Sequence, residues 1–422
     1  MPHLHRRAWL QGAAALALLP RPAPGAAQAA ASAASVTGRE QPALAVFDAL
    51  MQRFIIEQQL PGAQLAITHE RRLVHARGYG LAERVPARAV QPTDLFRIAS
   101  ISKPFTAVAV LQAVERGRIA LDAPLLAQLP LPAPRDARWH RITVRQLLQH
   151  RAGWDRERSF DPMFAASRVM QALQLDGMPT ARDIITFMLR QPLDFEPGER
   201  YAYSNFGYCL LGRLLEHLGG ERYEVSVRRD VLSPLGIRRM RLGQTALEGR
   251  APGEVRYYAE RNPLGRPISG LTHDAVPLPY GAWSLEAMDS HGGWLASAVD
   301  LVRFAAAFDD PAHCPLLKPA SIATMFARPD GAADSVPVHY ACGWRVRRLA
   351  QPGQINTWHT GMLDGSSTLL VRRHDGLDWA VLFNGQYTPD GRPAAVKIDR
   401  LLHEAAGQVR QWPADDQFDA CL

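Results

Sequence analysis

The chain has 422 residues, of which 47% are hydrophobic and 21% charged, so it is too apolar for a disordered protein and too mixed for a fibrous one. This length allows two or three domains, with a core large enough to fold without a metal or a disulfide. The net charge is +7 at pH 7, but the arginines are scattered, with no run that would follow a phosphate backbone. We therefore expect no nucleic-acid partner.

The first 29 residues have the features of an export signal. Arg6 and Arg7 precede a short apolar run over residues 13–19, and small residues up to Ala29 provide a cleavage pattern. The paired arginines resemble a twin-arginine signal, with a Sec-type signal as the alternative. The apolar run is shorter than the ~20 residues that span a bilayer. We expect a bacterial protein that is periplasmic or secreted, without a membrane span in the mature chain.

Hydrophobic periodicity predicts the elements in chain order. The first part is predicted to contain a helix over 43–60, strands over 64–68 and 73–78, and a helix over 100–117. Residues 122–285 are rich in proline and in helical patterns. The last part is predicted to contain strands over 367–373 and 377–384 and a helix over 394–406. The Asp375-Gly376 pair between these two strands is a typical hairpin turn.

This order predicts an α+β protein whose sheet is assembled from both ends of the chain. The sheet domain is expected to comprise residues 42–121 and 286–410, and a mainly helical domain over 122–285 is inserted between them.

The four cysteines are compatible with disulfides in an oxidising compartment. Cys209 lies in an apolar helical pattern and is expected to be a free buried thiol. Cys314 and Cys342 form the expected bond. No cysteine or histidine cluster has the spacing of a zinc site, so no metal is expected.

Ser100 and Lys103 form the first candidate catalytic pair. The chain contains only three lysines against 45 arginines, so a lysine three residues after a serine is informative. At a helix N-terminus this spacing places the amine beside the hydroxyl. A desolvated lysine can lose its proton and act as the base that activates a serine. The alternative is a chance spacing, with Lys103 a solvated surface charge.

Tyr203 and Asn205 form the second candidate element, where a polar loop enters an apolar helix. A tyrosine there can act as an acid or base if a cation such as Lys103 lowers its pKa. In the alternative interpretation Asn205 only caps the helix and Tyr203 only packs. His150, earlier in the chain, is expected to shape the helical domain rather than to react.

His359, Thr360 and Gly361 form the third element, just before the last hairpin. A polar pair followed by glycine at a strand edge offers side chains and backbone N–H groups to a substrate. An ordinary loop is the alternative.

In order and spacing, the three elements resemble the motifs of the serine β-lactamase and penicillin-binding protein superfamily, Ser-x-x-Lys, Tyr-x-Asn and Lys-Thr-Gly. The similarity extends to residues 96–106, 142–150, 197–208 and 292–297, and covers residues 42–406. The tyrosine in the second motif is similar to that of class C β-lactamases and their esterase and D-peptidase relatives. The resemblance implies a β-lactamase/DD-peptidase-like fold, with an antiparallel sheet flanked by N- and C-terminal helices and an inserted all-α domain.

The resemblance also implies a mechanism. Ser100 attacks a carbonyl and forms an acyl-enzyme that water then hydrolyses, without a metal or organic cofactor. Lys103 and Tyr203 share the proton transfers, and which of them is the base in acylation stays open. Asn205 binds Lys103 and the substrate. The backbone N–H groups of Ser100 and Met362 hold the oxyanion.

His359 stands where β-lactamases carry lysine. A histidine with the ordinary pKa near 6.5 is mostly uncharged at neutral pH, which disfavours penicillin-type carboxylates. We therefore expect hydrolysis of an ester or amide, such as a small ester or a D-amino-acid peptide, with slow or absent β-lactam turnover. The alternatives are a penicillin-binding or sensor-type protein that acylates without efficient turnover, a true β-lactamase, and acyl transfer to an acceptor other than water.

Overall fold

The computed structural model describes residues 35–421, apart from 260–263, 266, 268–274 and 332–335. The export signal expected over residues 1–29 lies outside the described residues. In the described part, no helix is long and apolar enough to cross a membrane.

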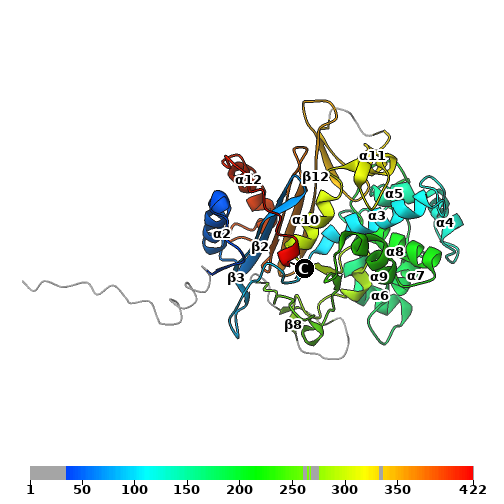
Figure 1. Ribbon diagram of the computed structural model, residues 1–422. Coiled ribbons are helices and arrows are strands. Elements are labelled where there is room, and N and C mark those ends of the chain that lie inside the picture. The colour runs from blue at the N-terminus through cyan, green and yellow to red at the C-terminus, as the bar shows by residue number, and fades with distance from the viewer. Residues whose placement is uncertain (1–34, 260–263, 266, 268–274, 332–335, 422) are drawn as a thin grey trace, which may run out of the picture.

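An antiparallel sheet joins the two ends of the chain (Figure 1). Within the described residues it has nine strands, eight of them in the order β1-β3-β2-β14-β13-β12-β11-β10, with β4 paired to β3. The strands are β1 (Val36–Thr37), β2 (Gly62–His69), β3 (Arg72–Glu83), β4 (Arg88–Ala89), β10 (Val338–Tyr340), β11 (Arg345–Arg348), β12 (Ile355–Leu363), β13 (Ser366–Arg372) and β14 (Leu377–Phe383). Because β2 pairs with β14, the predicted assembly of the sheet from both chain ends is confirmed.

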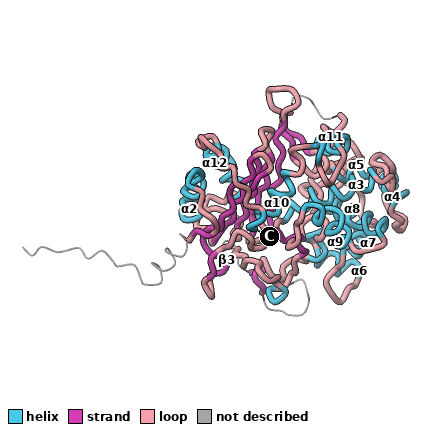
Figure 2. Tube along the Cα trace, in the orientation of Figure 1, coloured by secondary structure: helices cyan, strands magenta, loops and turns pink. Residues whose placement is uncertain are grey.

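The central strands are buried on both faces, so their apolar residues do not alternate with exposed polar ones. Leu65 and Ile67 of β2 face the helices α2 (Ala45–Glu57) and α12 (Ala394–Ala406). Ala66, between them, faces the larger core on the other side, where α10 (Ala298–Ala306) lies against β2 and β14. Figure 2 shows the sheet in magenta between these helices.

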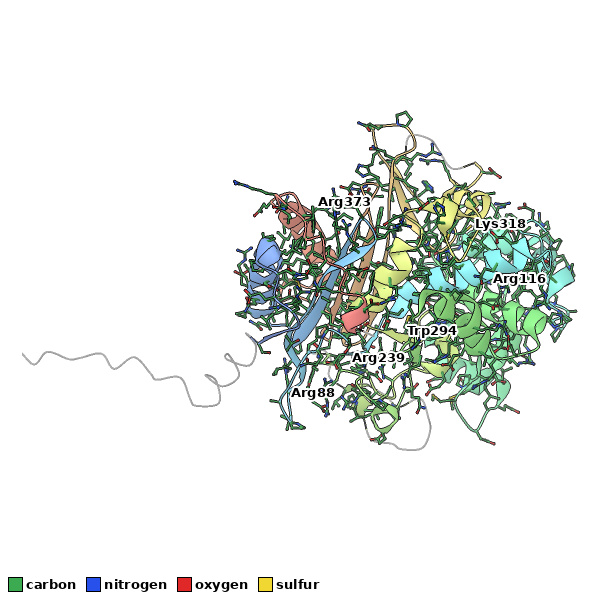
Figure 3. The ribbon with its side chains drawn as sticks, viewed as in Figure 1. Arg88, Arg116, Arg239, Trp294, Lys318 and Arg373 are labelled. Atoms are coloured by element: carbon green, nitrogen blue, oxygen red, sulfur yellow. The ribbon has the colours of Figure 1, made fainter. Side chains whose placement is uncertain are left out.

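The remaining helices gather beyond α10 (Figures 1 and 2). They are α3 (Ser102–Glu115), α4 (Leu125–Gln128), α5 (Val144–Leu148), α6 (Ala166–Leu173), α7 (Ala181–Met188), α8 (Asn205–Gly219), α9 (Tyr223–Val227) and α11 (Pro319–Phe326). A short three-stranded sheet, β5 (Phe96–Arg97), β9 (Trp294–Ala296) and β6 (Arg241–Leu242), holds the chain just before Ser100. Trp294 of β9 is buried between the main sheet and the helices, where its indole N–H donates to the Tyr223 hydroxyl (Figure 3).

The structure agrees with most predicted elements and differs in one detail. The hairpin of β13 and β14 is confirmed, with Leu370 opposite Ala380. The predicted helix over 100–117 is divided, because a 3₁₀ turn, η2 (Ala99–Ile101), precedes α3. The third motif, expected at a strand edge, lies within β12, with His359 opposite Leu370, so the alternative of an ordinary loop does not hold.

The predicted Cys314–Cys342 disulfide is wrong, because all four cysteines, which lie in the described part, are free thiols. Cys342 is fully buried, and its backbone N–H donates to the carbonyl of Met325 in α11. Cys314 follows the short turn η9 (Pro311–His313) and is only partly buried. Sequence spacing does not report the distance between Cα atoms, which must be under about 7 Å for a bond.

Candidate active site

Ser100 lies at the N-terminal end of α3 in a backbone segment of unusual conformation. Ala99, directly before it, has a φ of +50°, the left-handed region that non-glycine residues adopt at a cost of roughly 1 kcal/mol or more. The conformation is held from both sides. The Ile98 N–H donates to the Trp294 carbonyl, and the Trp294 N–H donates to the Ser102 hydroxyl. Such strain is typical of a site where a side chain must be presented in one orientation.

Lys103 is fully buried next to Ser100. Its Nζ lies 3.0 Å from the Oγ of Ser100, 2.8 Å from the Oδ1 of Asn205 and 2.8 Å from the carbonyl oxygen of His291. Burial lowers the pKa of Lys103 well below its ordinary value. The positive charge of Arg156 lowers that pKa further, and the carboxylate of Asp161 opposes the shift.

The partners of Lys103 determine where its lone pair points when the amine is neutral. A neutral amine has two hydrogens and one lone pair. The carbonyl of His291 and the amide oxygen of Asn205 can only accept, so they take both hydrogens. The lone pair then faces the third neighbour, the Ser100 hydroxyl. This is the geometry of a base ready to take the serine proton.

Tyr203 completes the contacts of the nucleophile, since its hydroxyl donates to the Oγ of Ser100 over 2.8 Å. Burial raises the pKa of Tyr203 above its ordinary value, and this effect outweighs Arg156, whose guanidinium lies 5.0 Å from the ring centroid. The condition under which Tyr203 would act as a base, a pKa lowered by a nearby cation, is therefore not met. At neutral pH the phenol is protonated and serves as a hydrogen-bond donor.

Asp161, which the sequence interpretation missed, fixes the orientation of Asn205. Its Oδ2 accepts a hydrogen bond of 2.6 Å from the Nδ2 of Asn205, which leaves the amide oxygen facing Lys103. Asp161 caps the 3₁₀ turn η4 (Pro162–Phe164). The Asp-Pro pair predicts that turn in the sequence, but nothing in the pattern connects it to a residue 44 positions later.

His359 carries no charge at neutral pH. Burial and the neighbouring Lys103 lower its pKa to about 3. Its Nδ1 lies 2.7 Å from the Thr360 carbonyl, which can only accept, so Nδ1 carries the proton. Its Nε2 then accepts from the Tyr340 hydroxyl over 2.9 Å. Tyr340, on β10, is a second residue that the sequence interpretation missed.

His150 packs between Tyr203 of the second motif and Tyr340, which contacts His359 of the third. Its ring packs 4.3 Å from that of Tyr203 and 4.4 Å from that of Tyr340, between centroids. Its Nδ1 accepts the backbone N–H of Ser204 over 3.2 Å. Within the described residues it forms no hydrogen bond with Ser100, which is compatible with the structural role expected for it.

Gly361 allows β12 to pass directly over the segment that carries Ser100. A Cβ atom there would lie 2.2 Å from the carbonyl oxygen of Ile98 and 2.2 Å from the Oγ1 of Thr368. No side chain fits these distances, so glycine is required for the close approach of the third motif to the first.

These side chains surround one cavity of about 340 Å³. It is lined by Ala99, Ser100, Arg156, Phe164, Tyr203, Asn205, Met288, His291, Gly292, Arg345, His359, Thr360, Met362, Leu363, Asp364 and Gln386. All three motifs therefore meet at one place. Within the described residues, no group of three His, Cys, Asp or Glu side chains is arranged to hold a metal.

Two arginines bring positive charge to this cavity. Arg345, on β11, is half-buried, and its guanidinium has no carboxylate partner among the described residues. Arg156 lies in an exposed loop and forms an ion pair with the exposed Glu157. The cavity therefore has a cationic wall even though His359 is neutral.

Comparison with known proteins agrees with this geometry. The family model described as Beta-lactamase matches residues 46–403. The chain is 30% identical over 272 residues to the probable fimbrial assembly protein FimD, serogroup H1, of Dichelobacter nodosus, covering 63% of this chain and 61% of the relative. It is 32% identical over 243 residues to esterase EstB of Burkholderia gladioli, covering 56% and 59%. The chain thus spans about three fifths of the length of both relatives.

The fold is also that of a solved structure, the D-amino acid amidase of Ochrobactrum anthropi SV3. The TM-score is 0.67 at 21% identity, and the match covers 88% of this chain and all of that one. The chain belongs to the β-lactamase family, whose members share the serine β-lactamase and penicillin-binding protein fold. The resemblance inferred from the three motifs is therefore confirmed.

Proposed function

We propose that this protein is an exported serine hydrolase that cleaves an ester or amide bond through an acyl-enzyme on Ser100. The observation that carries the proposal is the environment of Lys103. Its amine is buried, its pKa is lowered, and both of its other partners are acceptors, so its lone pair faces the Ser100 hydroxyl. Export to the periplasm is supported by the signal-like sequence over residues 1–29.

In acylation, the Oγ of Ser100 attacks the substrate carbonyl carbon while its proton passes to the Nζ of Lys103. The tetrahedral oxyanion is held by the backbone N–H groups of Ser100 and Met362. Removing one such donor typically costs ~3–4 kcal/mol of transition-state stabilisation. The proton then passes from Lys103 to the leaving oxygen or nitrogen, with the Tyr203 hydroxyl as the relay. The bond to the leaving group breaks and the acyl group stays on Ser100.

In deacylation, a water molecule attacks the acyl carbon and gives its proton to the same neutral amine. The Ser100 oxygen leaves and takes that proton back, so the enzyme returns to its starting state. Because burial keeps Tyr203 protonated, we assign the base to Lys103 and the donor to Tyr203.

The charged and neutral groups that line the cavity limit which substrates it can bind. His359 and Thr360 bind it through the edge of β12, and the neutral His359 cannot hold a carboxylate by charge. Arg345 supplies a cation instead, so an anionic leaving group is accepted. Small esters and D-amino-acid peptides are the proposed substrates, which is supported by relatives named as an esterase and a D-amino acid amidase. Slow β-lactam turnover stays a prediction.

The test is p-nitrophenyl ester hydrolysis by the purified mature protein, beside Ser100→Ala and Lys103→Ala. Lys318→Ala is the matched control, because Lys318 is exposed at the start of α11 (Figure 3). We expect turnover by the parent and the control and none by the two site variants. Turnover indifferent to Ser100 would contradict the proposal. A single burst without turnover would favour the penicillin-binding or sensor-type alternative, and nitrocefin turnover faster than ester turnover would identify a true β-lactamase.

A further inference from the structure

Asp364 places a carboxylate at the end of the active-site cavity. It follows β12 directly, two residues after Met362, and it lines the same cavity as Ser100. Along β12 the residues before it alternate, with Thr360 and Met362 less buried than their neighbours. Asp364 lies just beyond the end of the strand, and its place in the cavity lining, rather than the alternation of β12, brings it to the site.

The carboxylate is held in place by its neighbours. The indole N–H of Trp283 donates to Oδ2 of Asp364 over 3.0 Å. The next residue, Gly365, has a φ of +75°, and a Cβ atom there would lie 2.7 Å from the Cβ of Tyr257. The turn is therefore fixed against the adjacent loop. The second carboxylate oxygen of Asp364, Oδ1, has no hydrogen-bond partner among the described residues.

The surroundings of Asp364 are apolar. Phe164 and Met362 line the cavity and are each 46% exposed, which is unusual for large apolar side chains. Trp283 packs with Leu363 in a small apolar cluster beneath the cavity, and its ring centroid lies 6.4 Å from that of Phe164. The carboxylate of Asp364, with one oxygen free, therefore lies next to the exposed apolar side chains of Phe164 and Met362.

The position of Asp364 relative to the other charges assigns it to one side of the scissile bond. Arg345 lies opposite Trp358 in the sheet, six residues and roughly 20 Å of strand before Asp364. The leaving group departs toward Tyr203, which Arg156 contacts, so the cationic wall is on the leaving-group side. Asp364 lies past Met362 in the other direction, where the acyl part of the substrate extends.

We propose that Asp364 binds an ammonium group at the end of the substrate's acyl part, and that Phe164 and Met362 contact the hydrocarbon between that ammonium and the reacting carbonyl. The substrate class is therefore an acyl donor that ends in an amine. Asp364 lies two residues beyond Met362, about 7 Å along an extended chain, so the amine lies several bonds from the carbonyl. This inference rests on the proposed function and specifies its substrate.

The experiment compares p-nitrophenyl esters that differ only by a terminal NH₃⁺ or CH₃ group, at pH 7. The pairs are glycyl and propionyl, β-alanyl and butyryl, and 6-aminohexanoyl and heptanoyl. Turnover by Ser100→Ala is subtracted as background. We expect the parent to prefer the amine-terminated member in kcat/KM, most strongly in the longest pair. In Asp364→Asn, which keeps an oxygen to accept from Trp283, this preference falls by about 10- to 100-fold.

The matched control is Asp375→Asn, which removes the same charge at the opposite end of β13, where Asp375 pairs with Arg373. It should keep the parent's preference. An equal loss on both members of each pair in Asp364→Asn would show that Asp364 only anchors Trp283, and would overturn the inference. So would a parent that prefers the methyl-terminated esters.

A binding measurement separates this inference from the proposed function. By calorimetry on the Ser100→Ala protein, 6-aminohexananilide should bind more tightly than heptananilide, and Asp364→Asn in the same background should abolish the difference. If no ester is hydrolysed but this difference is seen, the proposed function fails and the site stands. If esters are hydrolysed and the two anilides bind alike, the inference fails alone.

Discussion

Asp161 accepts a hydrogen bond of 2.6 Å from the amide nitrogen of Asn205, and this contact decides which end of that amide faces Lys103. The two residues lie on different elements, and within the described residues neither forms a hydrogen bond with Ser100. The contact turns the amide oxygen of Asn205 toward Lys103, where it accepts a hydrogen from the amine. The lone pair of the neutral amine then faces the Ser100 hydroxyl. The carboxylate also raises the pKa of Lys103 against the effect of burial.

Replacement of Asp161 is therefore expected to change both rate and pH dependence. In Asp161→Asn, the Asn205 amide loses its fixed orientation, and kcat should fall by about tenfold or more. Loss of the negative charge lowers the pKa of Lys103 further, so the acid limb of kcat/KM should move to lower pH. The control is Asp155→Asn, in the same loop, where the carboxylate pairs with Arg200. If the acid limb of the kcat/KM profile of Asp161→Asn stays at the parent's pH, the proposed role of Lys103 as the base is contradicted.

Replacement of Lys103 by methionine should change how stability depends on pH. The unfolded chain holds a proton on this amine up to its ordinary pKa of 10.5, whereas in the folded protein burial lowers that pKa well below 10.5. In that window the unfolded state binds more protons, so the parent's free energy of unfolding rises with pH. Lys103→Met lacks this contribution.

The free energy of unfolding of Lys103→Met, relative to the parent, should therefore fall as pH rises from 7 to 9, by up to about 1.4 kcal/mol per pH unit. Urea unfolding at several pH values measures it, and Lys318→Met, at an exposed position, should show no such trend. A constant difference would mean that Lys103 stays charged in the folded protein.

Arg345→Gln should impair substrates with an anionic leaving group. We expect kcat/KM for 3-carboxyphenyl acetate to fall by about tenfold, because a charge-assisted hydrogen bond is lost, while 3-carbamoylphenyl acetate is unaffected. Arg348→Gln, on the same strand but exposed outside the cavity, is the control. Equal losses on both esters would assign Arg345 a structural part only.

Gly361→Ala should separate the third motif from the nucleophile. Because the new Cβ would lie 2.2 Å from the Ile98 carbonyl, β12 must move away from Ser100. Overpacking of this kind costs about 1–3 kcal/mol, and the displaced backbone no longer holds the oxyanion. Thermal unfolding and ester turnover should both decline. Gly177→Ala, where nothing lies within 4 Å, should change neither, and an active Gly361→Ala protein would argue against the proposed oxyanion site.

The sequence allowed prediction of those parts of the site that depend on local spacing. Ser100 and Lys103 are three residues apart at a helix start, so their contact follows from helix geometry. Asp161 and Tyr340 are single residues in ordinary patterns, and their contacts with Asn205 and His359 arise only from the packing of distant elements. No periodicity encodes such contacts.

The errors have a common physical origin. A base role for Tyr203 required a cation to lower its pKa, but burial has the larger effect and raises that pKa. The Cys314–Cys342 bond was inferred from compartment and spacing, whereas the structure buries Cys342 with its thiol unpaired. Burial depth is set by the whole fold, so local sequence could not supply it. The domain boundaries stay a prediction.

The pairing of β2 with β14 also has a consequence during synthesis. Ala66 and Ala380 lie side by side in the sheet, yet more than 300 residues separate them along the chain. A ribosome that has produced both Ser100 and Lys103 has still to make the strands β12 to β14 before the central sheet can close. Contacts of such long range form late. The cavity around Ser100 is therefore incomplete until almost the whole chain has emerged, and a chain that ends before Leu377 should lack the proposed activity.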